Sequence, residues 1–326
     1  MSLCEFWEAA HEALRNGKLI HMSLVVDQTK GSPGTTAARM FVTSDGVRYG
    51  TIGGGVMEKR VLDEAIAILN QDPLPKPRLR QLRHRADSSD QSSGLICGGT
   101  QTNLELVLSP NLHLELVAEI AFAGVSGSGS VLCTSDGLKL SDQSVETVKL
   151  KQMEEEWEVS LPLLNLRRVA VFGAGHCGVA LANAMQRLDY EVTILDSRSD
   201  ISTTEGLAKS IKLIVTNYEV AAACVDHPNY TVAIVMTYSM DTDLKALSGL
   251  LDKGFDWIGL MGSQVKIAHI RQKLILKGYS DLQIAQIVAP VGIDINSDTP
   301  EEIAISIAAK ILLKRESNCQ HKINLW

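Results

Sequence analysis

A run of three glycines is the first segment whose residue types and spacing could carry chemistry. Gly53-Gly54-Gly55 lies between a predicted strand, 47–52, and a predicted helix that continues to about residue 70. Consecutive glycines at such a junction let backbone N–H groups converge on an anion or on a polar ring. Glu58 falls in the first turn of the helix, where the helix dipole favours a carboxylate. We therefore predict a cofactor-binding loop at the three glycines, with Glu58 as a candidate catalytic acid. A flexible turn followed by an ordinary helix N-terminal acid is the alternative.

A cysteine beside two further glycines is the second such segment. Cys97-Gly98-Gly99 follows a polar stretch, 87–94, and precedes a predicted strand, 102–108. Neighbouring backbone N–H groups can stabilise a thiolate, which is the reactive and metal-binding form of cysteine. We predict that Cys97 is a reactive or ligating thiol. The alternative is that Cys97 is a small buried residue ahead of the strand.

The third segment is a G-x-G-x-x-G turn in the second half of the chain. An apolar strand, 167–172, leads into Gly173-Ala174-Gly175-His176-Cys177-Gly178, and small and apolar residues then recur at helical spacing. In such a turn the first glycine permits the tight bend, the second lets the backbone approach a pyrophosphate, and the third lets helix and strand pack closely. The helix N-terminus supplies N–H donors and the positive end of a dipole. We therefore predict a nucleotide-binding turn that includes Gly173, Gly175, His176 and Gly178.

An acid and several strand ends complete this predicted unit. Asp196 ends the next strand, close to the roughly 20-residue offset of the ribose-binding acid in dinucleotide-binding units. Asp196 favours NAD, whereas Arg198 leaves room for the 2′-phosphate of NADP. Because ligands collect at the carboxyl ends of parallel strands, we expect one crevice to be lined by the following residues. They are His176, Asp196, Thr237, Asp241, Gly262 and Ser263.

These elements predict an α/β protein of two domains. The second half alternates strands and helices, which is typical of a Rossmann-like doubly wound parallel sheet. The first half combines helices with hairpins and predicts a mixed α/β domain. A charged stretch contains Glu154-Glu155-Glu156. We therefore place the domains at 1–150 and 164–326, with a linker over 151–163.

Composition narrows the classes of function. The net charge of −7 gives no electrostatic case for a nucleic-acid partner. No apolar run approaches the roughly 20 residues that span a membrane. The N-terminal segment has the pattern of an amphipathic helix rather than of a signal peptide. The six cysteines lack C-x-x-C spacing, which favours reduced thiols. We expect a cytoplasmic protein without a nucleic-acid or membrane partner.

A set of short motifs occurs in order along both halves of the chain. The motifs are Gly31-Ser32-Pro33-Gly34, Arg39-Met40, Gly50-Thr51-Ile52-Gly53-Gly54-Gly55 with Glu58, Cys97-Gly98-Gly99, Gly173-Ala174-Gly175-His176, Ile258-Gly259-Leu260-Met261-Gly262-Ser263, Pro290-Val291-Gly292-Ile293-Asp294-Ile295 and Thr299-Pro300-Glu301-Glu302-Ile303-Ala304. Each motif alone is weakly specific. In this order they resemble the xanthine dehydrogenase accessory family, also called the XdhC/CoxI type.

The resemblance implies a maturation factor with no turnover of its own. Members of the family are thought to bind the molybdenum cofactor as cargo and to assist replacement of an oxo by a sulfido ligand with a cysteine desulfurase. They then deliver the cofactor to the apo-enzyme of a molybdenum hydroxylase. On this resemblance, Gly53–Gly55 and Cys97–Gly99 lie near the molybdopterin, and Cys97 approaches molybdenum or transient sulfur. A homodimer is compatible with such a role.

The sequence departs from the family pattern in three places. Val56 stands where many relatives have a cysteine after the triple glycine. Gln264 stands where relatives often have a basic residue after the Gly-Ser pair. Tyr238-Ser239-Met240-Asp241 replaces a segment that often contains histidine. The first departure leaves Cys97 as the stronger candidate thiol, and the other two bear on the ligand contacts of the second domain.

Two other functions remain open from the residues themselves. The Rossmann turn with Asp196 suits an NAD(P)-dependent oxidoreductase, and it also suits a nucleotide sensor that controls partner docking. Hydride chemistry is usually accompanied by a general acid or base. His176 and Tyr238 are the nearest candidates in sequence, and neither has an obvious partner.

Overall fold

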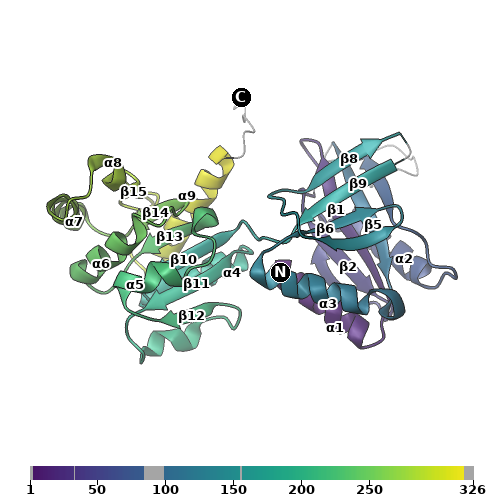
Figure 1. The fold of residues 1–326 in the computed structure, drawn as a ribbon, viewed down its shortest axis with the longest axis horizontal. Coiled ribbons are helices and arrows are strands. Elements are labelled where there is room, and N and C mark those ends of the chain that lie inside the picture. The colour runs from purple at the N-terminus through teal and green to yellow at the C-terminus, as the bar shows by residue number, and fades with distance from the viewer. Residues whose placement is uncertain (1–2, 33, 84–98, 155, 319–326) are drawn as a thin grey trace. The chain divides into compact units, whose positions relative to one another are not determined.

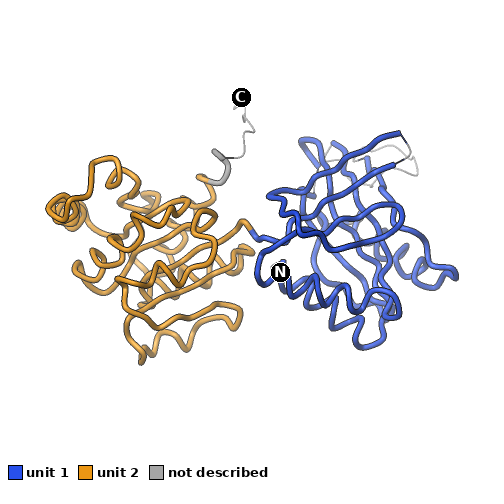
Figure 2. Tube along the Cα trace, in the orientation of Figure 1, with its two compact units in different colours: residues 1–165 blue, residues 166–326 orange. Residues whose placement is uncertain are grey.

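The computed structural model describes residues 3–32, 34–83, 99–154 and 156–318. The chain divides into two compact units, Met1–Asn165 and Leu166–Trp326 (Figure 2). Each unit has its own hydrophobic core. Among the helices within the described ranges, none is long and apolar enough to cross a membrane.

The described residues of unit 1 form two antiparallel sheets and three helices (Figure 1). The strands of the larger sheet are β1 (Ile20–Gln28), β2 (Arg39–Thr43), β3 (Arg48–Thr51), β4 (Arg78–Arg83) and β5 (Thr100–Leu108). Their order across that sheet is β3-β2-β1-β5-β4. The smaller sheet comprises β6 (Ser130–Thr134), β7 (Gly137–Ser141), β8 (Lys149–Met153) and β9 (Glu156–Pro162) in the order β7-β6-β9-β8. The helices are α1 (Leu3–Arg15), α2 (Gly55–Leu69) and α3 (Pro110–Ser126).

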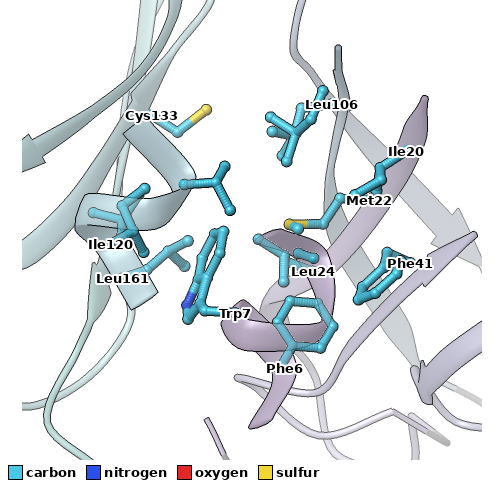
Figure 3. Packing of buried hydrophobic residues seen from close by; sticks show 14 of the residues in the cluster. Phe6, Trp7, Ile20, Met22, Leu24, Phe41, Leu106, Ile120, Cys133 and Leu161 are labelled. Atoms are coloured by element: carbon cyan, nitrogen blue, oxygen red, sulfur yellow. The ribbon is translucent and has the colours of Figure 1, made fainter. Parts of the chain in front are cut away.

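The two faces of the larger sheet pack against different elements. One face buries Met22 and Leu24 of β1 in a cluster with side chains of α1, α3 and the smaller sheet, among them Phe6, Trp7, Ile120 and Leu161 (Figure 3). The opposite face buries Val25 and Met40 against Met57 and Val61 of α2. Side chains alternate between the faces of a strand, which is why neighbouring residues of β1 serve both cores.

The core of unit 2 is a six-stranded parallel sheet. Its strands are β10 (Arg168–Phe172), β11 (Glu191–Asp196), β12 (Lys212–Val215), β13 (Thr231–Val235), β14 (Trp257–Leu260) and β15 (Ile287–Val288). They lie in the order β12-β11-β10-β13-β14-β15. The principal helices are α4 (His176–Arg187), α5 (Tyr218–Ala221), α6 (Met240–Leu250), α7 (Gln264–Leu276), α8 (Asp281–Ile284) and α9 (Pro300–Asn318). Side chains of α4 and α9 share one core with the sheet, and side chains of α5, α6 and α7 share another. The predicted doubly wound Rossmann-like fold is therefore confirmed.

The segment expected to be a linker, 151–163, instead contributes residues of β8 and β9 to the smaller sheet. Lys151 of β8 lies opposite Glu158 of β9, and their side chains form an ion pair at 3.0 Å. Val159 and Leu161 alternate with these charges and are buried in the core of unit 1. The charges belong to the exposed face of a strand, so charge density alone misled the prediction. The boundary between the units follows Asn165.

Candidate functional site

The triple glycine forms a loop that only glycine adopts without strain. Gly53, Gly54 and Gly55 have φ angles of 131°, 77° and 69°. Positive φ is disfavoured for residues with a Cβ atom. Gly54 is the N-cap of α2, and Gly53 and Gly55 are exposed. The sequence therefore places a surface without side chains between β3 and α2.

Glu58 binds this loop from within. Its Oε1 accepts the backbone N–H groups of Ile52 and Gly54, each at 2.8 Å, and the hydroxyl of Thr51. Its Oε2 accepts Nη1 of Arg48 at 3.0 Å. Burial acts to raise the pKa of Glu58, but these hydrogen bonds and the charge of Arg48 outweigh it, so the pKa is lowered.

The Glu58 carboxylate thus acts as an internal anion for part of the glycine loop. We expected the N–H groups of this loop to converge on a ligand, but those of Ile52 and Gly54 bind Glu58. Glu58 is only 5% exposed. This geometry is that of a residue that positions the loop, and it gives Glu58 little access to a ligand.

A buried amide connects the glycine loop to the first motif of the chain. Nε2 of Gln101 donates to the carbonyl oxygen of Ile52 at 3.3 Å, and its Oε1 accepts the N–H of Gly34 at 3.2 Å. The same amide donates to Oδ1 of Asn103 at 2.8 Å. Gln101 and Asn103 are fully buried. Because a buried amide is costly unless it is hydrogen-bonded, Gln101 fixes the two loops against each other.

Gly99, the described residue of the Cys97-Gly98-Gly99 motif, lies at the same end of the larger sheet. Thr100, at the start of β5, donates its N–H to Oγ1 of Thr29 at 2.7 Å and accepts the N–H of Thr29 at 2.9 Å. A Cβ atom on Gly99 would lie 2.9 Å from the N atom of Ser32, so the backbones approach closely there. Cys97 and Gly98 lie outside the described residues. Arg83, the last residue of β4, pairs with Thr100. The described parts of three distant motifs therefore meet at one end of the sheet.

In unit 2 the Rossmann turn has the close approaches that its glycines predict. Gly173 has a φ of 123°, and a Cβ atom there would lie 2.4 Å from the carbonyl oxygen of Met236. A Cβ atom on Gly178 would lie 1.8 Å from the oxygen of Gly173. A Cβ atom on Gly175 would meet nothing within 4 Å. Gly175 is the N-cap of α4, and His176, the first residue of that helix, is exposed. Open space therefore lies at the second glycine, where a pyrophosphate would approach.

Asp196 is fully buried at the end of β11 and binds the turn itself. Its Oδ2 accepts the N–H of Ala174 at 2.8 Å and Nη2 of Arg198 at 2.9 Å. Its Oδ1 accepts the backbone N–H and Nε of Arg198, both at 3.0 Å. Burial acts to raise the pKa of Asp196, but the hydrogen bonds from Arg198 and Ala174 outweigh it and lower the pKa.

A buried ion pair at the carboxyl ends of β13 and β14 was missed in the sequence. Nζ of Lys266 forms a close ion pair with the fully buried Asp243 and donates to the carbonyl oxygen of Met261 at 3.1 Å. Asp243 in turn accepts the N–H and the hydroxyl of Thr237, at 2.9 and 2.7 Å. The available signal was a lysine three positions after Ser263, the helix N-cap.

The predicted Gly262-Ser263 motif contacts the lysine of this ion pair. Ser263 caps α7 by accepting the N–H of Lys266 at 3.3 Å. A Cβ atom on Gly262 would lie 2.8 Å from Cδ of Lys266, so the lysine stem lies close to that glycine. Contacts thus link the Rossmann turn, Thr237 and Lys266 at one edge of the sheet. Asp241, which we expected in the same crevice, lines a separate hollow with Glu219 and Lys245. Within the described ranges no cluster of three histidine, cysteine or acidic residues could hold a metal ion.

The fold and these sites define a two-unit α/β protein with a polar loop cluster in the first unit and a Rossmann domain in the second. Residues 169–311 match the family described as the XdhC Rossmann domain, and residues 11–75 match the XdhC and CoxI family. The chain belongs to the XdhC/CoxI family. The predicted resemblance is confirmed.

Relatives and a solved structure agree with this assignment. The "Uncharacterized protein YqeB" of Escherichia coli K12 is 26% identical over 89% of this chain, and the match covers 42% of that protein. A probable xanthine dehydrogenase subunit of Bacillus subtilis 168 is 24% identical over 89% of this chain and 91% of its own length. The crystal structure titled as a xanthine dehydrogenase (BH1974) from Bacillus halodurans has a TM-score of 0.73 at 19% identity, covering 100% of this chain and 98% of the other. That likeness shows a shared fold over both units.

Proposed function

We propose that this protein is an accessory factor for a molybdenum hydroxylase of the xanthine dehydrogenase type. In this role it binds the molybdenum cofactor, assists its sulfuration together with a cysteine desulfurase, and takes part in its insertion into the apo-enzyme. Family membership and the likeness to the Bacillus subtilis protein support the accessory role. The cargo, the sulfuration and the partners are parts of the proposal.

The convergence of the family motifs at one end of the larger sheet carries this proposal. Gly53 and Gly55 offer exposed backbone there. The guanidinium of Arg48 pairs with Glu58, which binds the same loop, and the Arg48 side chain is 51% exposed. Glycine backbone and a guanidinium are the groups that bind phosphate in proteins. The hydroxyls of Thr29 and Ser32 add groups that can bind the polar edge of a pterin. The described residues therefore suit a phosphorylated pterin.

Cys97 is the proposed thiol of this site. The described residues that flank its segment, Arg83 and Gly99, both lie at the same end of the sheet. A soft thiolate is a suitable contact for molybdenum or for transient sulfur. We expect Cys97→Ala to lower pterin retention or activation of the client enzyme. Cys224→Ala, in unit 2, is the matched control and should leave both unchanged.

Bound pterin is the direct readout of the proposed cargo. The protein is purified anaerobically from cells that make molybdopterin and from cells that do not, and pterin is assayed by the fluorescence of its oxidised form. Pterin present only in the first preparation is the expected result. Absence of pterin from both, together with oxidation of NAD(P)H by the pure protein, would contradict the accessory role.

We further propose that the Rossmann turn binds a dinucleotide. The open space at Gly175 and the close packing at Gly173 and Gly178 support this, because they match the three requirements of such a turn. An NAD(P)-dependent oxidoreductase is the second candidate function. The Lys266–Asp243 pair favours it, since it places a proton-bearing ammonium at the strand ends, where hydride chemistry needs an acid or base. Turnover of NAD(P)H with a carbonyl or imine substrate would favour this candidate over a nucleotide sensor.

A further inference from the structure

We propose that the Rossmann turn selects a dinucleotide with a phosphate on its adenosine ribose, NADP(H) rather than NAD(H), and that Arg198 is the specificity residue. This inference rests on the proposed nucleotide binding. It reverses the simplest prediction from the sequence, in which the acid at the end of the second strand selects NAD.

The acid has no acceptor capacity left for a ribose. An ionised carboxylate has about four lone-pair sites. Asp196 uses its two oxygens for four hydrogen bonds, one from Ala174 and three from Arg198. The side chain of Asp196 is also fully buried. An NAD ribose could reach this carboxylate only by displacing Arg198, which would leave the buried charge without its main partner.

Arg198 is the group that a ligand would meet instead. Its side chain is 41% exposed, and its two side-chain bonds to Asp196 use Nε and Nη2. Nη1 is not used in these bonds. A guanidinium held in this way presents a fixed planar edge, and phosphate is an anion that such an edge binds well.

Two neighbours hold the guanidinium and extend the site. Cζ of Arg198 lies 4.6 Å from the centroid of the Tyr238 ring, and Tyr238 is 56% exposed. Ser197 lies between the acid and the arginine in sequence, and its hydroxyl is 3.5 Å from that of Tyr238. Arg198 is therefore fixed by a carboxylate at one edge and an aromatic ring at one face, with a hydroxyl donor beside it.

Binding of NADPH and NADH is compared by calorimetry on the full chain. We expect the wild type to bind NADPH more tightly by about tenfold or more, because a charge-assisted hydrogen bond to phosphate is stronger than one to a neutral hydroxyl. Arg198→Ala should weaken NADPH binding by a similar factor and should strengthen NADH binding, because it frees the acceptors of Asp196. Arg198→Lys keeps the charge without the planar edge and should fall between the two. Arg187→Ala changes an exposed arginine in the last turn of α4 and should change neither affinity.

Three results would overturn the inference. They also distinguish its failure from a failure of the proposed nucleotide binding. Tighter or equal binding of NADH by the wild type would refute the specificity and leave nucleotide binding intact. Equal loss of both nucleotides in Arg198→Ala and in Arg198→Lys, with the fold retained by circular dichroism, would reduce Arg198 to a support of the turn. Binding of neither nucleotide at millimolar concentration would refute nucleotide binding itself.

Discussion

Gly34 donates its backbone N–H to Oε1 of Gln101 at 3.2 Å, across 67 positions of sequence. This hydrogen bond joins the first family motif to the start of β5. The same amide reaches the carbonyl oxygen of Ile52, immediately before the triple glycine. One buried side chain therefore aligns the loops that we propose to hold the cofactor.

The contact at Gly34 predicts a strong effect of a single methyl group. A Cβ atom there would lie 2.3 Å from the carbonyl oxygen of Ile52 and 2.4 Å from Oε1 of Gln101. We expect Gly34→Ala to lower the free energy of unfolding by about 1–3 kcal/mol through overpacking, and to reduce pterin retention. Gly124→Ala is the matched control, since Gly124 lies in α3 and its Cβ would meet nothing within 4 Å. That control should leave pterin retention unchanged. It should raise the free energy of unfolding by about 0.5–1 kcal/mol, because alanine is more favourable than glycine within a helix. Full pterin retention in Gly34→Ala would show that this contact does not contribute to pterin binding.

The bonds of Glu58 predict a loss of loop order when its charge is removed. Glu58→Gln replaces one carboxylate oxygen by an amide nitrogen, which cannot accept a hydrogen bond. The variant therefore loses either the hydrogen bond from Arg48 or those from the backbone N–H groups. We expect a loss of about 1–3 kcal/mol in the free energy of unfolding. Asp63→Asn, an exposed carboxylate on the same helix, should change the stability little. Chemical denaturation of both variants gives the comparison, and equal stabilities would contradict the role assigned to Glu58.

The lowered pKa of Glu58 also sets the direction of an acid effect. Its pKa in the folded protein lies below the unfolded value of about 4.3, so the folded state gains stability above that pH. The gain is lost as the pH falls through the folded pKa. Glu58→Gln should therefore be less stable than the wild type at pH 7 and should approach it in stability as the pH is lowered below 4.

Buried His21 predicts a second, separate pH dependence. Burial lowers its pKa; Arg78 and Arg80 add to this effect, whereas the charges of Glu105 and Glu64 oppose it. Because the unfolded chain then binds a proton at a higher pH, about 6.5, the protein should lose stability as the pH falls below that value. The slope from one such histidine is at most about 1.4 kcal/mol per pH unit. His21→Gln should flatten it. An unchanged slope in His21→Gln would show that another group is responsible.

The open space at Gly175 predicts that the two proposed ligands can be separated. Gly175→Asp should keep the fold, because Gly175 has a φ of −72° and its Cβ would meet nothing within 4 Å. It should abolish nucleotide binding, because it adds a negative charge at the phosphate position, and it should spare pterin retention. Gly178→Ala should instead destabilise unit 2, since its Cβ would lie 1.8 Å from the oxygen of Gly173. Loss of pterin from Gly175→Asp would contradict separate ligands.

Local patterns predicted the fold well where one segment contains the whole signal. The strand, turn and helix around Gly173–Gly178 were predicted correctly because the glycine spacing is itself the geometric requirement. The strand β9, which contains Val159 and Leu161, was missed because exposed charges masked its alternation.

The candidate sites could be predicted only in part, because their key contacts are not local. Nothing in the sequence links Gln101 to Gly34, or Lys266 to Asp243. The triple glycine and Asp196 were recognised, but their expected hydrogen bonds to a ligand are made by Glu58 and Arg198 within the chain. Residue types identified the groups, and only the folded backbone shows which groups are already paired.

We propose that the loop cluster of unit 1 holds the pterin. Hydrogen–deuterium exchange of the full chain, measured by mass spectrometry with and without bound molybdopterin, tests this claim most directly. We expect slower exchange in residues 29–38 and 51–58 when the pterin is bound, with no change in residues 173–178. Protection of residues 173–178, without any in 29–38 or 51–58, would contradict it.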